Sequence, residues 1–491
     1  MKRYTPVFII SAAICMLFAL WGAILPDNMK SITVDMTSFI TENFGWYYLL
    51  TLAIILIFCL YILFSPFGGI KLGAADEEAE FSLPSWFAML FSAGMGMGLV
   101  FWTTAEPISH AFKATPGAKP GSNEAVDDAF QYAFFHWGIH AWAVYGVVAL
   151  VLAYFSFYKG YPGLISATLV PLFGEKRMTG PIGKTIDVLA IIATVMGVAA
   201  TLGFGTAQIN EGLNYLFHIP SNFMIQVLIL IVSTILFTWS AWTGIDKGIK
   251  SLSNINMVLG FVLMIILFFV GPTLYILNTF TDTLGNYIAH FIDMTLRLEP
   301  LENGKRTWIN NWTVFYWAWW IAWAPFVGIF IARVSRGRTI KEFILGVLFV
   351  PALVCFIFFA VFGASAVHLQ LNGIDLSQFP VETTTFAMLQ HYPLGKIMSF
   401  ITLFVIALFF ITSADSATYV LGMLSSNGDI HPTSLVKVTW GLLLSLIAGI
   451  VMYAGGTQGL QNVLIIAALP FSVVIFMMMF SLLKALQKNH R

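Results

Sequence analysis

Four tryptophans lie within seven residues of one apolar segment, residues 315–323, as Trp317, Trp319, Trp320 and Trp323. An earlier apolar segment carries a second aromatic group, made of Trp137, Trp142 and Tyr145. A quaternary ammonium group cannot donate a hydrogen bond, so it must be held by dispersion and by cation–π attraction, worth about 0.5 to 2 kcal/mol per ring. The two groups therefore predict an aromatic cage for a permanently charged small cation. Aromatic filling of the protein core is the alternative.

A glycine-rich stretch offers a partner for the other end of a zwitterion. Residues 92–98 place glycine at alternate positions, Gly94, Gly96 and Gly98, which weakens the helix at membrane depth. Unwound backbone is tolerated in a bilayer where it lines a cavity, and its free N–H groups could bind a carboxylate. The alternative is close helix packing, because Gly94 and Gly98 also form a GxxxG pattern.

Two adjacent hydroxyls, Thr412 and Ser413, lie in a late apolar segment. Hydroxyl and carbonyl oxygens are ligands that suit Na⁺, and together with the carbonyls of Ser92 and Met95 they predict a small-cation site. The competing interpretation is that these hydroxyls bond back to their own helix.

Buried ionisable residues in a membrane segment usually have a function, because burying a charge is costly. Asp415 fits this rule, with a structural role at a helix end as its alternative. Glu106 precedes Pro107 near the external end of a span, where we expect it to be wet. His136 and His140 are either proton relays or hydrogen-bonded core residues.

The elements that position these residues must be membrane helices. Only 10% of the 491 residues are charged and 58% are hydrophobic, too apolar for a soluble fold. About twelve continuously apolar stretches are long enough to cross a bilayer as helices, and their lack of period-two alternation excludes a barrel. They begin near positions 6, 46, 85, 127, 185, 221, 254, 309, 340, 395, 435 and 460. The sequence thus predicts an all-α multi-pass membrane protein.

Most of the 24 basic residues fall on one side when alternate loops are compared. The positive-inside rule then predicts that both termini are cytoplasmic, in the cell membrane. The basic run at 333–341 becomes a cytoplasmic loop rather than a nucleic-acid patch.

The eighth span, residues 313–332, contains Pro325 and Gly328 and lies five spans after the glycine-rich third span. Two broken helices at this offset indicate inverted repeats, with the binding site where they meet. We therefore expect two accessory helices at 1–83, a first five-helix repeat with an external loop at 84–300, and a second repeat with a short cytoplasmic tail at 301–491.

Four motifs together resemble the betaine/choline/carnitine transporter family across the whole chain. They are Gly94-Met-Gly-Met-Gly98, Thr103-Thr-Ala-Glu-Pro107, residues 315–323 and Arg333-Val-Ser-Arg-Gly-Arg338. The resemblance implies twelve helices, a LeuT-like inverted-repeat core and a homotrimer in lipid. It also implies an aromatic box of Trp137, Trp142, Tyr145 and Trp320, with Phe315, Trp319 and Trp323 along the substrate path.

The same resemblance favours one branch of the family. Proton-coupled choline carriers tend to have Asp where this chain has Gly98, and carnitine exchangers have Arg within the segment that corresponds to residues 253–257, which contains none here. The closest branch is sodium-coupled glycine betaine import, and a choline, carnitine or other quaternary-amine carrier, driven by protons or by exchange, is the alternative. One implied Na⁺ site comprises Ser92, Met95, Phe409, Thr412 and Ser413, and a second comprises Thr194, Thr201 and Phe326. The sequence has no enzyme motif, so we expect no catalytic residue and no cofactor, with Na⁺ as the coupling ion.

Overall fold

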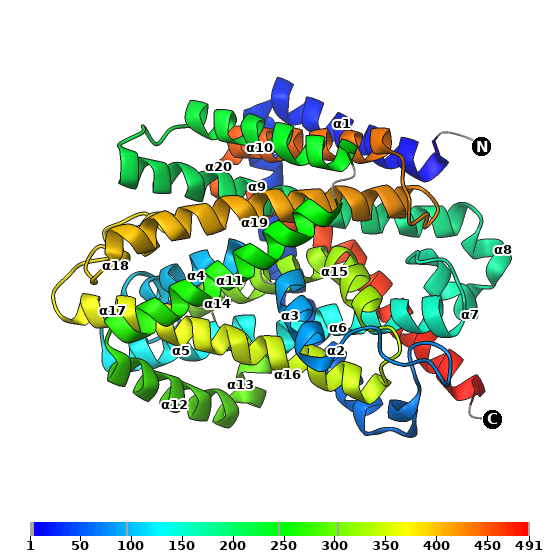
Figure 1. The fold of residues 1–491 in the computed structure, drawn as a ribbon, viewed down its shortest axis with the longest axis horizontal. Coiled ribbons are helices and arrows are strands. Elements are labelled where there is room, and N and C mark those ends of the chain that lie inside the picture. Colours follow the sequence, from blue (N-terminus) through cyan, green and yellow to red (C-terminus); the bar gives the residue numbers. More distant parts are fainter. Residues whose placement is uncertain (1–3, 95–96, 244–245, 302–303, 490–491) are drawn as a thin grey trace.

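The computed structural model describes residues 4–94, 97–243, 246–301 and 304–489, with the backbone alone at 91–94, 97, 246–251 and 489. Within these ranges the chain is helical, and its only β pairing is a single bridge between Lys71 and Thr339. The predicted all-α class is confirmed. Figure 1 shows the long helices α9, α16 and α19 running in broadly similar directions across the molecule.

The helices of the first half include two short 3₁₀ turns, η1 and η4, and two π-helical turns, η2 and η3. In chain order they are α1 Pro6–Ile24, α2 Pro26–Phe64, η1 Pro66–Gly69, α3 Leu83–Gly94, α4 Met97–Ile108, η2 Ser109–Lys113, α5 Asn123–Trp137, α6 Ile139–Ala153, η3 Tyr154–Tyr158, η4 Ser166–Leu169, α7 Val170–Phe173, α8 Glu175–Met178, α9 Pro181–Phe217, α10 Phe223–Thr243 and α11 Asp246–Val270.

The second half adds two further π-helical turns, η5 and η6. Its helices are α12 Thr273–Ala289, α13 Phe291–Leu296, α14 Lys305–Ile309, η5 Asn310–Val314, α15 Phe315–Val334, α16 Ile340–Phe358, η6 Phe359–Gly363, α17 Ala364–Leu371, α18 Thr384–Leu389, α19 Gly395–Ser425 and α20 Ser434–Asn489.

In the described part of the chain, ten helical segments are long and apolar enough to cross a membrane. The third predicted span is not among them because it consists of two 12-residue helices, α3 and α4, on either side of residues 95 and 96. The last two predicted spans lie within α20, which contains a kink with non-helical angles at Gly456. With these two adjustments the helices match the twelve predicted stretches.

Burial separates the helices that line the interior from those that face lipid. The most apolar stretches of α9 and α15 are 89% buried, whereas those of α10 and α11 are 22% buried. Large apolar side chains such as Trp239 on α10 and Phe269 on α11 are exposed, as expected where the surroundings are acyl chains. Helix α15 packs against α6 and α9 and therefore lies at the centre of the protein.

The break expected at Pro325 does not occur, and that prediction was wrong. Helix α15 continues through Pro325 to Val334. Proline removes one N–H donor from the helical ladder, a loss that neighbouring helices can compensate in a membrane protein. Gly328 serves close packing, since a Cβ there would lie 2.7 Å from Val148 Cγ1 on α6.

Two loops meet at the end of the molecule where α1 begins and α20 ends (Figure 1). The loop after α2 and the loop after α15 share the Lys71–Thr339 bridge and an ion pair of 2.5 Å between Arg336 Nε and Glu77 Oε1. Arg338 lies 4.2 Å from the centre of the Trp86 ring. The predicted basic loop is thus tied to an acidic loop of the same protein.

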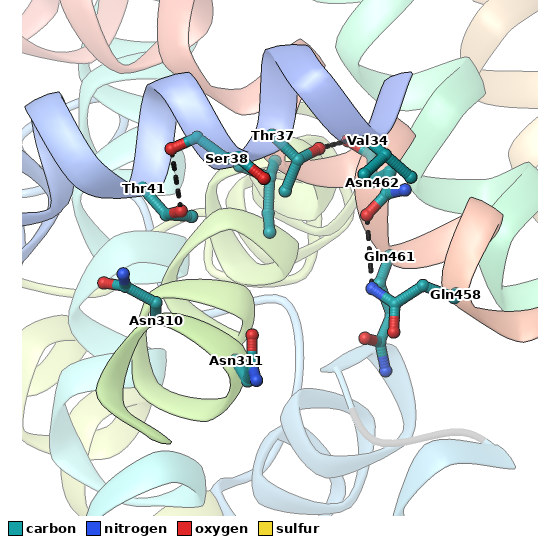
Figure 2. A pocket seen from close by; sticks show the side chains of 10 residues that line it. Val34, Thr37, Ser38, Thr41, Asn310, Asn311, Gln458, Gln461 and Asn462 are labelled. Atoms are coloured by element: carbon teal, nitrogen blue, oxygen red, sulfur yellow. Dashed lines mark hydrogen bonds between the residues drawn. The ribbon is translucent and has the colours of Figure 1, made fainter. Parts of the chain in front are cut away.

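A cavity of about 200 Å³ lies between α2, η5 and α20 (Figure 2). Most of its lining is uncharged and polar, including Thr37, Asn311 and Gln461. Two of its walls also bond to each other, since the Thr37 hydroxyl on α2 donates to the carbonyl of Asn462 on α20 at 3.4 Å. None of the predicted cage residues lines this cavity.

Candidate functional site

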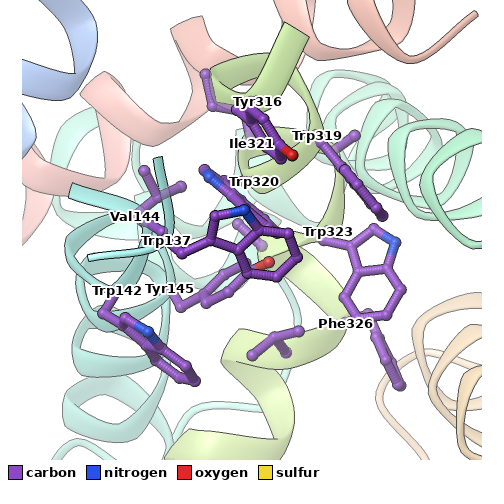
Figure 3. Close-up of a cluster of buried hydrophobic side chains, with 14 of the residues drawn as sticks. Trp137, Trp142, Val144, Tyr145, Tyr316, Trp319, Trp320, Ile321, Trp323 and Phe326 are labelled. Atoms are coloured by element: carbon purple, nitrogen blue, oxygen red, sulfur yellow. The ribbon is translucent and has the colours of Figure 1, made fainter. Parts of the chain in front are cut away.

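Three of the predicted cage residues come together in the interior. Trp137 ends α5, Tyr145 lies on α6 and Trp320 lies on α15. The Trp320 ring centre is 5.0 Å from that of Trp137 and 6.0 Å from that of Tyr145, at interplanar angles of 73° and 77°. Each residue is at most 2% exposed. The rings therefore meet edge to face in a dry cluster, as Figure 3 shows.

This cluster depends on a helix interruption that the sequence analysis missed. The fourth span stops at Trp137 and resumes at Ile139, with Gly138 at φ −89° and ψ −146°. A Cβ on Gly138 would lie 2.4 Å from the carbonyl oxygen of Phe134, so only glycine fits. The last carbonyls of a helix lack intrahelical partners. One of these, the carbonyl of His136, accepts a 3.0 Å hydrogen bond from Trp320 Nε1.

Trp142 lies on the other side of Tyr145 from this cluster. Its ring meets the Tyr145 ring edge to face at 5.7 Å, and Figure 3 shows it set apart from Trp137 and Trp320. Trp142 thus supports the Tyr145 wall, and its role in binding stays a prediction.

The predicted path residues continue the aromatic cluster along α15. Trp319 stacks on Trp320 at 5.4 Å and 12°, and Phe315 lies 5.6 Å from Trp319. One turn further, Trp323 packs against Phe326 at 5.5 Å. All four path and cage rings of α15 are buried. Phe315, Trp319 and Trp320 form an aromatic wall by ring contacts, and Trp323, one turn beyond Trp319 on the same helix, extends it toward Phe326.

Gly98 lies directly against this wall. A Cβ at position 98 would be 3.2 Å from Trp137 Cη2 and 3.5 Å from Trp319 Cη2. Gly98 therefore adjoins one predicted cage ring and one predicted path ring, and its role in binding stays a prediction. Gly94 ends α3, and Gly96 lies outside the described residues, as does the stretch expected to unwind.

Several buried donors in the cluster have no hydrogen-bond partner within the described part of the structure. They are the Tyr145 hydroxyl and the indole N–H groups of Trp319 and Trp323. Buried polar groups in native proteins are almost always satisfied, so these donors are open to an acceptor such as water or a ligand. A ligand that carries a carboxylate would supply one.

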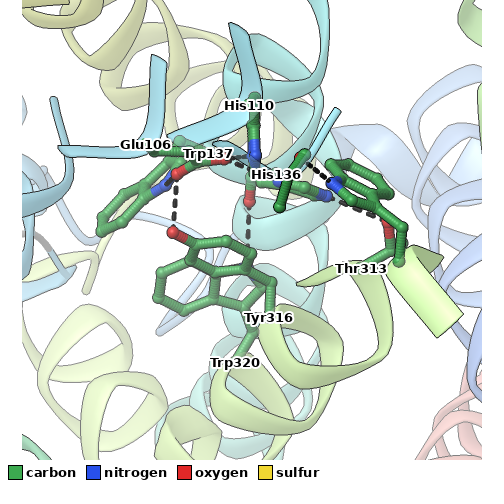
Figure 4. Close-up of polar contacts among 9 residues, drawn as sticks. Glu106, His110, His136, Trp137, Thr313, Tyr316 and Trp320 are labelled. Carbon is green, nitrogen blue, oxygen red and sulfur yellow. Dashed lines mark hydrogen bonds and ion pairs between the residues drawn. The ribbon is translucent and has the colours of Figure 1, made fainter. Parts of the chain in front are cut away.

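Glu106 is completely buried, against our expectation that it is wet. It lies on α4 and engages four partners from three elements (Figure 4). Its Oε1 is 2.7 Å from His136 Nδ1 and 3.1 Å from His110 Nε2, and its Oε2 accepts hydrogen bonds of 2.9 Å from Trp137 Nε1 and 2.6 Å from the Tyr316 hydroxyl. The signal in the sequence was an acid beside a proline in an apolar segment.

Glu106, His110 and His136 place ligand-type atoms within 4.8 Å of one another, as a metal site would. Metal–ligand bonds of 2.0 Å at tetrahedral angles keep neighbouring ligand atoms about 3.3 Å apart. The 2.7 Å separation between His136 and Glu106 is instead a hydrogen bond. An ionised carboxylate only accepts, so both imidazoles donate to it. The other candidate relay, His140, bonds Thr295 Oγ1 at 2.9 Å.

Trp308 on α14 is also buried and lies beside this cluster. It is 5% exposed and donates a 2.6 Å hydrogen bond from Nε1 to the carbonyl of Ala114. It covers the His110 ring at 4.9 Å and so seals the Glu106 cluster.

The described part of the first predicted Na⁺ site lies on α19, which packs against α4. Thr412 is buried and its hydroxyl donates to the carbonyl of Leu408 at 2.9 Å, Phe409 is 8% exposed, and Ser413 is half-buried. The Thr412 oxygen keeps its lone pairs for an ion. The Ser92 side chain and all of Met95 lie outside the described residues, so this site stays a prediction.

The second predicted Na⁺ site involves two buried threonines of α9. Thr194 and Thr201 donate to the carbonyls of Ala190 and Gly197 at 2.8 Å and 3.1 Å. A Cβ on Gly197 would lie 2.7 Å from Trp323 Cδ1, which places this part of α9 beside the aromatic wall near Phe326. The site remains a prediction.

Comparison with known protein families shows which family the chain belongs to. The model of the betaine/carnitine/choline family transporters matches residues 6–491. The chain belongs to this family. Membership makes the protein a multi-pass membrane transporter and not an enzyme.

The chain aligns with individual relatives over nearly their whole length. The chain is 53% identical to the glycine betaine transporter OpuD of Bacillus subtilis, over 100% of this chain and 96% of the relative. It is 44% identical to a probable glycine betaine transporter of Desulfitobacterium hafniense, over 100% and 99%. It is 45% identical to an ectoine/hydroxyectoine transporter of Virgibacillus pantothenticus, over 99% and 97%. This family member thus has relatives named for different zwitterions.

Proposed function

We propose that the protein imports glycine betaine across the cell membrane together with Na⁺. The observation that carries the proposal is the buried edge-to-face cluster of Trp137, Tyr145 and Trp320. Separation of such rings would provide aromatic surfaces on several sides of a trimethylammonium group, which dispersion and cation–π attraction hold. The cluster is dry, so the attraction is little screened by water.

The carboxylate end of glycine betaine has candidate donors nearby. Within the described residues, the indole N–H groups of Trp319 and Trp323 and the Tyr145 hydroxyl are buried without partners. Together with the backbone of the glycine-rich stretch, they provide donors for an anion beside a cation cage. A zwitterion satisfies both requirements, whereas choline lacks the carboxylate.

The names of two relatives agree with this substrate, and a third widens the choice. Ectoine is a zwitterion without a trimethylammonium group. Choline and carnitine remain the alternatives from the family, driven by protons or by exchange. A competition panel of these compounds against labelled glycine betaine separates them, and the cage favours glycine betaine over ectoine.

We further propose the LeuT-like inverted-repeat arrangement, with units at 1–83, 84–300 and 301–491, and assembly as a homotrimer in the lipid bilayer. Alternating access would then come from rocking one group of helices against the rest. Both termini would lie in the cytoplasm.

Reconstituted protein tests the transport proposal directly. Proteoliposomes with an inward Na⁺ gradient should accumulate labelled glycine betaine, chemically unchanged, and accumulation should stop when K⁺ replaces external Na⁺. Uptake that follows an imposed proton gradient and ignores Na⁺ would refute sodium coupling.

Thr412→Val tests the ion site within that assay. The substitution removes one oxygen at nearly constant volume, so the Na⁺ concentration for half-maximal uptake should rise roughly tenfold. Thr402→Val is the matched control, because Thr402 is also buried on α19 and donates to the carbonyl one turn back at 2.8 Å. An equal effect of both substitutions would contradict a role for Thr412 in binding Na⁺.

A further inference from the structure

The Glu106 carboxylate holds two aromatic side chains of the candidate site in place. Both of its oxygens are hydrogen-bonded, and the two donors on Oε2 are aromatic residues, Trp137 and Tyr316. Trp137 is a wall of the cage. Tyr316 stacks on Trp320 at 5.7 Å and 24°, and on Trp319 at 6.2 Å and 14°. One carboxylate therefore fixes two rings that both contact Trp319 and Trp320.

The direction of these bonds matters for binding a cation. An aromatic ring has a negative face and a positive edge, and its N–H or O–H group lies at that edge. Trp137 turns its N–H toward Glu106, and Trp320 turns its N–H toward the carbonyl of His136. The positive edges of both indoles are thus neutralised by acceptors, and the rings can offer their faces to a cation. Hydrogen bonding to an anion also polarises the indole toward greater electron density on the ring.

The charge itself lies close to the cage. Glu106 is hydrogen-bonded directly to the Trp137 indole, and every hydrogen-bond partner of Glu106 is buried. Charges interact far more strongly in such surroundings than in water. His110 and His136 both bond the other carboxylate oxygen, Oε1. The Oε2 oxygen is therefore directed at the aromatic residues.

We propose that Glu106 positions Trp137 and Tyr316 through hydrogen bonds and that its negative charge favours the cationic end of the substrate. This inference rests on the proposed function, because it requires that the cage bind a quaternary ammonium group. Glu106 would then be the residue that makes the binding site prefer a cation to an uncharged group of the same shape.

A pair of ligands isolates that preference. Glycine betaine and 3,3-dimethylbutanoate have nearly the same shape, but the second carries an uncharged tert-butyl group in place of trimethylammonium. Dissociation constants of both, measured by calorimetry on the purified full-length protein, give a preference ratio. We expect the unsubstituted protein to prefer glycine betaine by roughly tenfold or more.

Glu106→Gln should reduce this ratio severalfold, mainly by weakening glycine betaine. A residue that only supports the fold would weaken both ligands by the same factor, and an unchanged ratio would overturn the inference. Asp187→Asn is the matched control, because Asp187 is a buried carboxylate on α9 that accepts hydrogen bonds from Ser166, which is not a cage residue. Its ratio should equal that of the unsubstituted protein.

Tyr316→Phe keeps the test decisive if Glu106→Gln does not fold. It removes one hydrogen bond to Glu106 and leaves the carboxylate charge in place, so both ligands should weaken equally and the ratio should persist. Loss of the ratio in this variant, or no preference in the unsubstituted protein, would overturn the inference. Failure of glycine betaine to bind the unsubstituted protein would instead remove the proposed function, and the inference with it.

Discussion

At the scale of single residues, Trp320 has two separate tasks. Its ring forms a wall against Trp137 and Tyr145, and its N–H fastens that wall to the carbonyl of His136. A phenylalanine in its place would keep part of the surface and lose the bond. Leucine would lose both the aromatic face and the bond.

Trp320→Leu should therefore raise the KM for glycine betaine uptake at least tenfold, because it removes a cation–π face and its anchor. Trp239→Leu makes the same change on the exposed surface of α10, where the tryptophan is 64% exposed. Uptake by proteoliposomes containing each variant gives the comparison. A normal KM in Trp320→Leu would exclude this cage.

Residue types alone predicted much of this cluster, because tryptophans at such density in a membrane segment have few other uses. They did not predict how the rings are held. The acid in Thr103-Thr-Ala-Glu-Pro107 was expected to be wet, since its four partners come from positions 110, 136, 137 and 316 and only folding brings them together. The first sodium site remains a prediction because the Ser92 side chain and Met95 lie outside the described residues.

At the scale of elements, the interruption at Gly138 shapes the site. It frees the His136 carbonyl for Trp320 and sets the direction of the Trp137 ring at the end of α5. The chain approaches itself so closely here that a Cβ would also meet Tyr287 and Phe356, at 2.9 Å and 3.0 Å.

Gly138→Ala should lower the stability of the protein by about 1 to 3 kcal/mol, the usual cost of overpacking, and should raise the KM for glycine betaine. Gly285→Ala on α12 is the control, because a Cβ there meets nothing within 4 Å. Thermal unfolding in detergent measures the first effect and uptake measures the second. Equal unfolding temperatures for the two variants would contradict the proposed constraint.

Pro325 and Gly138 show that helix breaks are difficult to predict from residue type. Pro325 suggested a break, yet α15 passes through it, and α6 and α9 pack against this helix. Gly138 was a single glycine in an apolar run and drew no attention, yet it ends α5. Local propensity is a weak guide inside a protein when tertiary packing decides the backbone.

At the scale of the whole molecule, hydropathy was the most reliable guide. The lipid-facing helices α1, α10 and α11 and the buried helices α9 and α15 are all recognisable as apolar stretches, because lipid and protein interior both exclude charge. The sequence does not reveal which stretch faces which environment. In the structure α1 begins and α20 ends at the same end, in agreement with an even number of spans (Figure 1).

Labelling from outside the cell tests the orientation. All three native cysteines are buried, so a single introduced cysteine can be read with low background. A membrane-impermeant maleimide added to intact cells should label Lys119→Cys. It should label Lys488→Cys only after permeabilisation, since the positive-inside rule places that end in the cytoplasm. The reverse pattern would invert the proposed topology.

The hydrogen bonds of Glu106 also limit how the transporter can move. Donors on α5 and α15 and an acceptor on α4 are joined at distances of 2.6 to 2.9 Å, and such bonds weaken steeply once stretched or bent. We therefore expect the parts of these three helices that carry the bonds to move together during the transport cycle. We then expect relative motion between helices elsewhere, for instance where α19 packs against α4. Substrate recognition and the moving body of the transporter would thus share a single carboxylate.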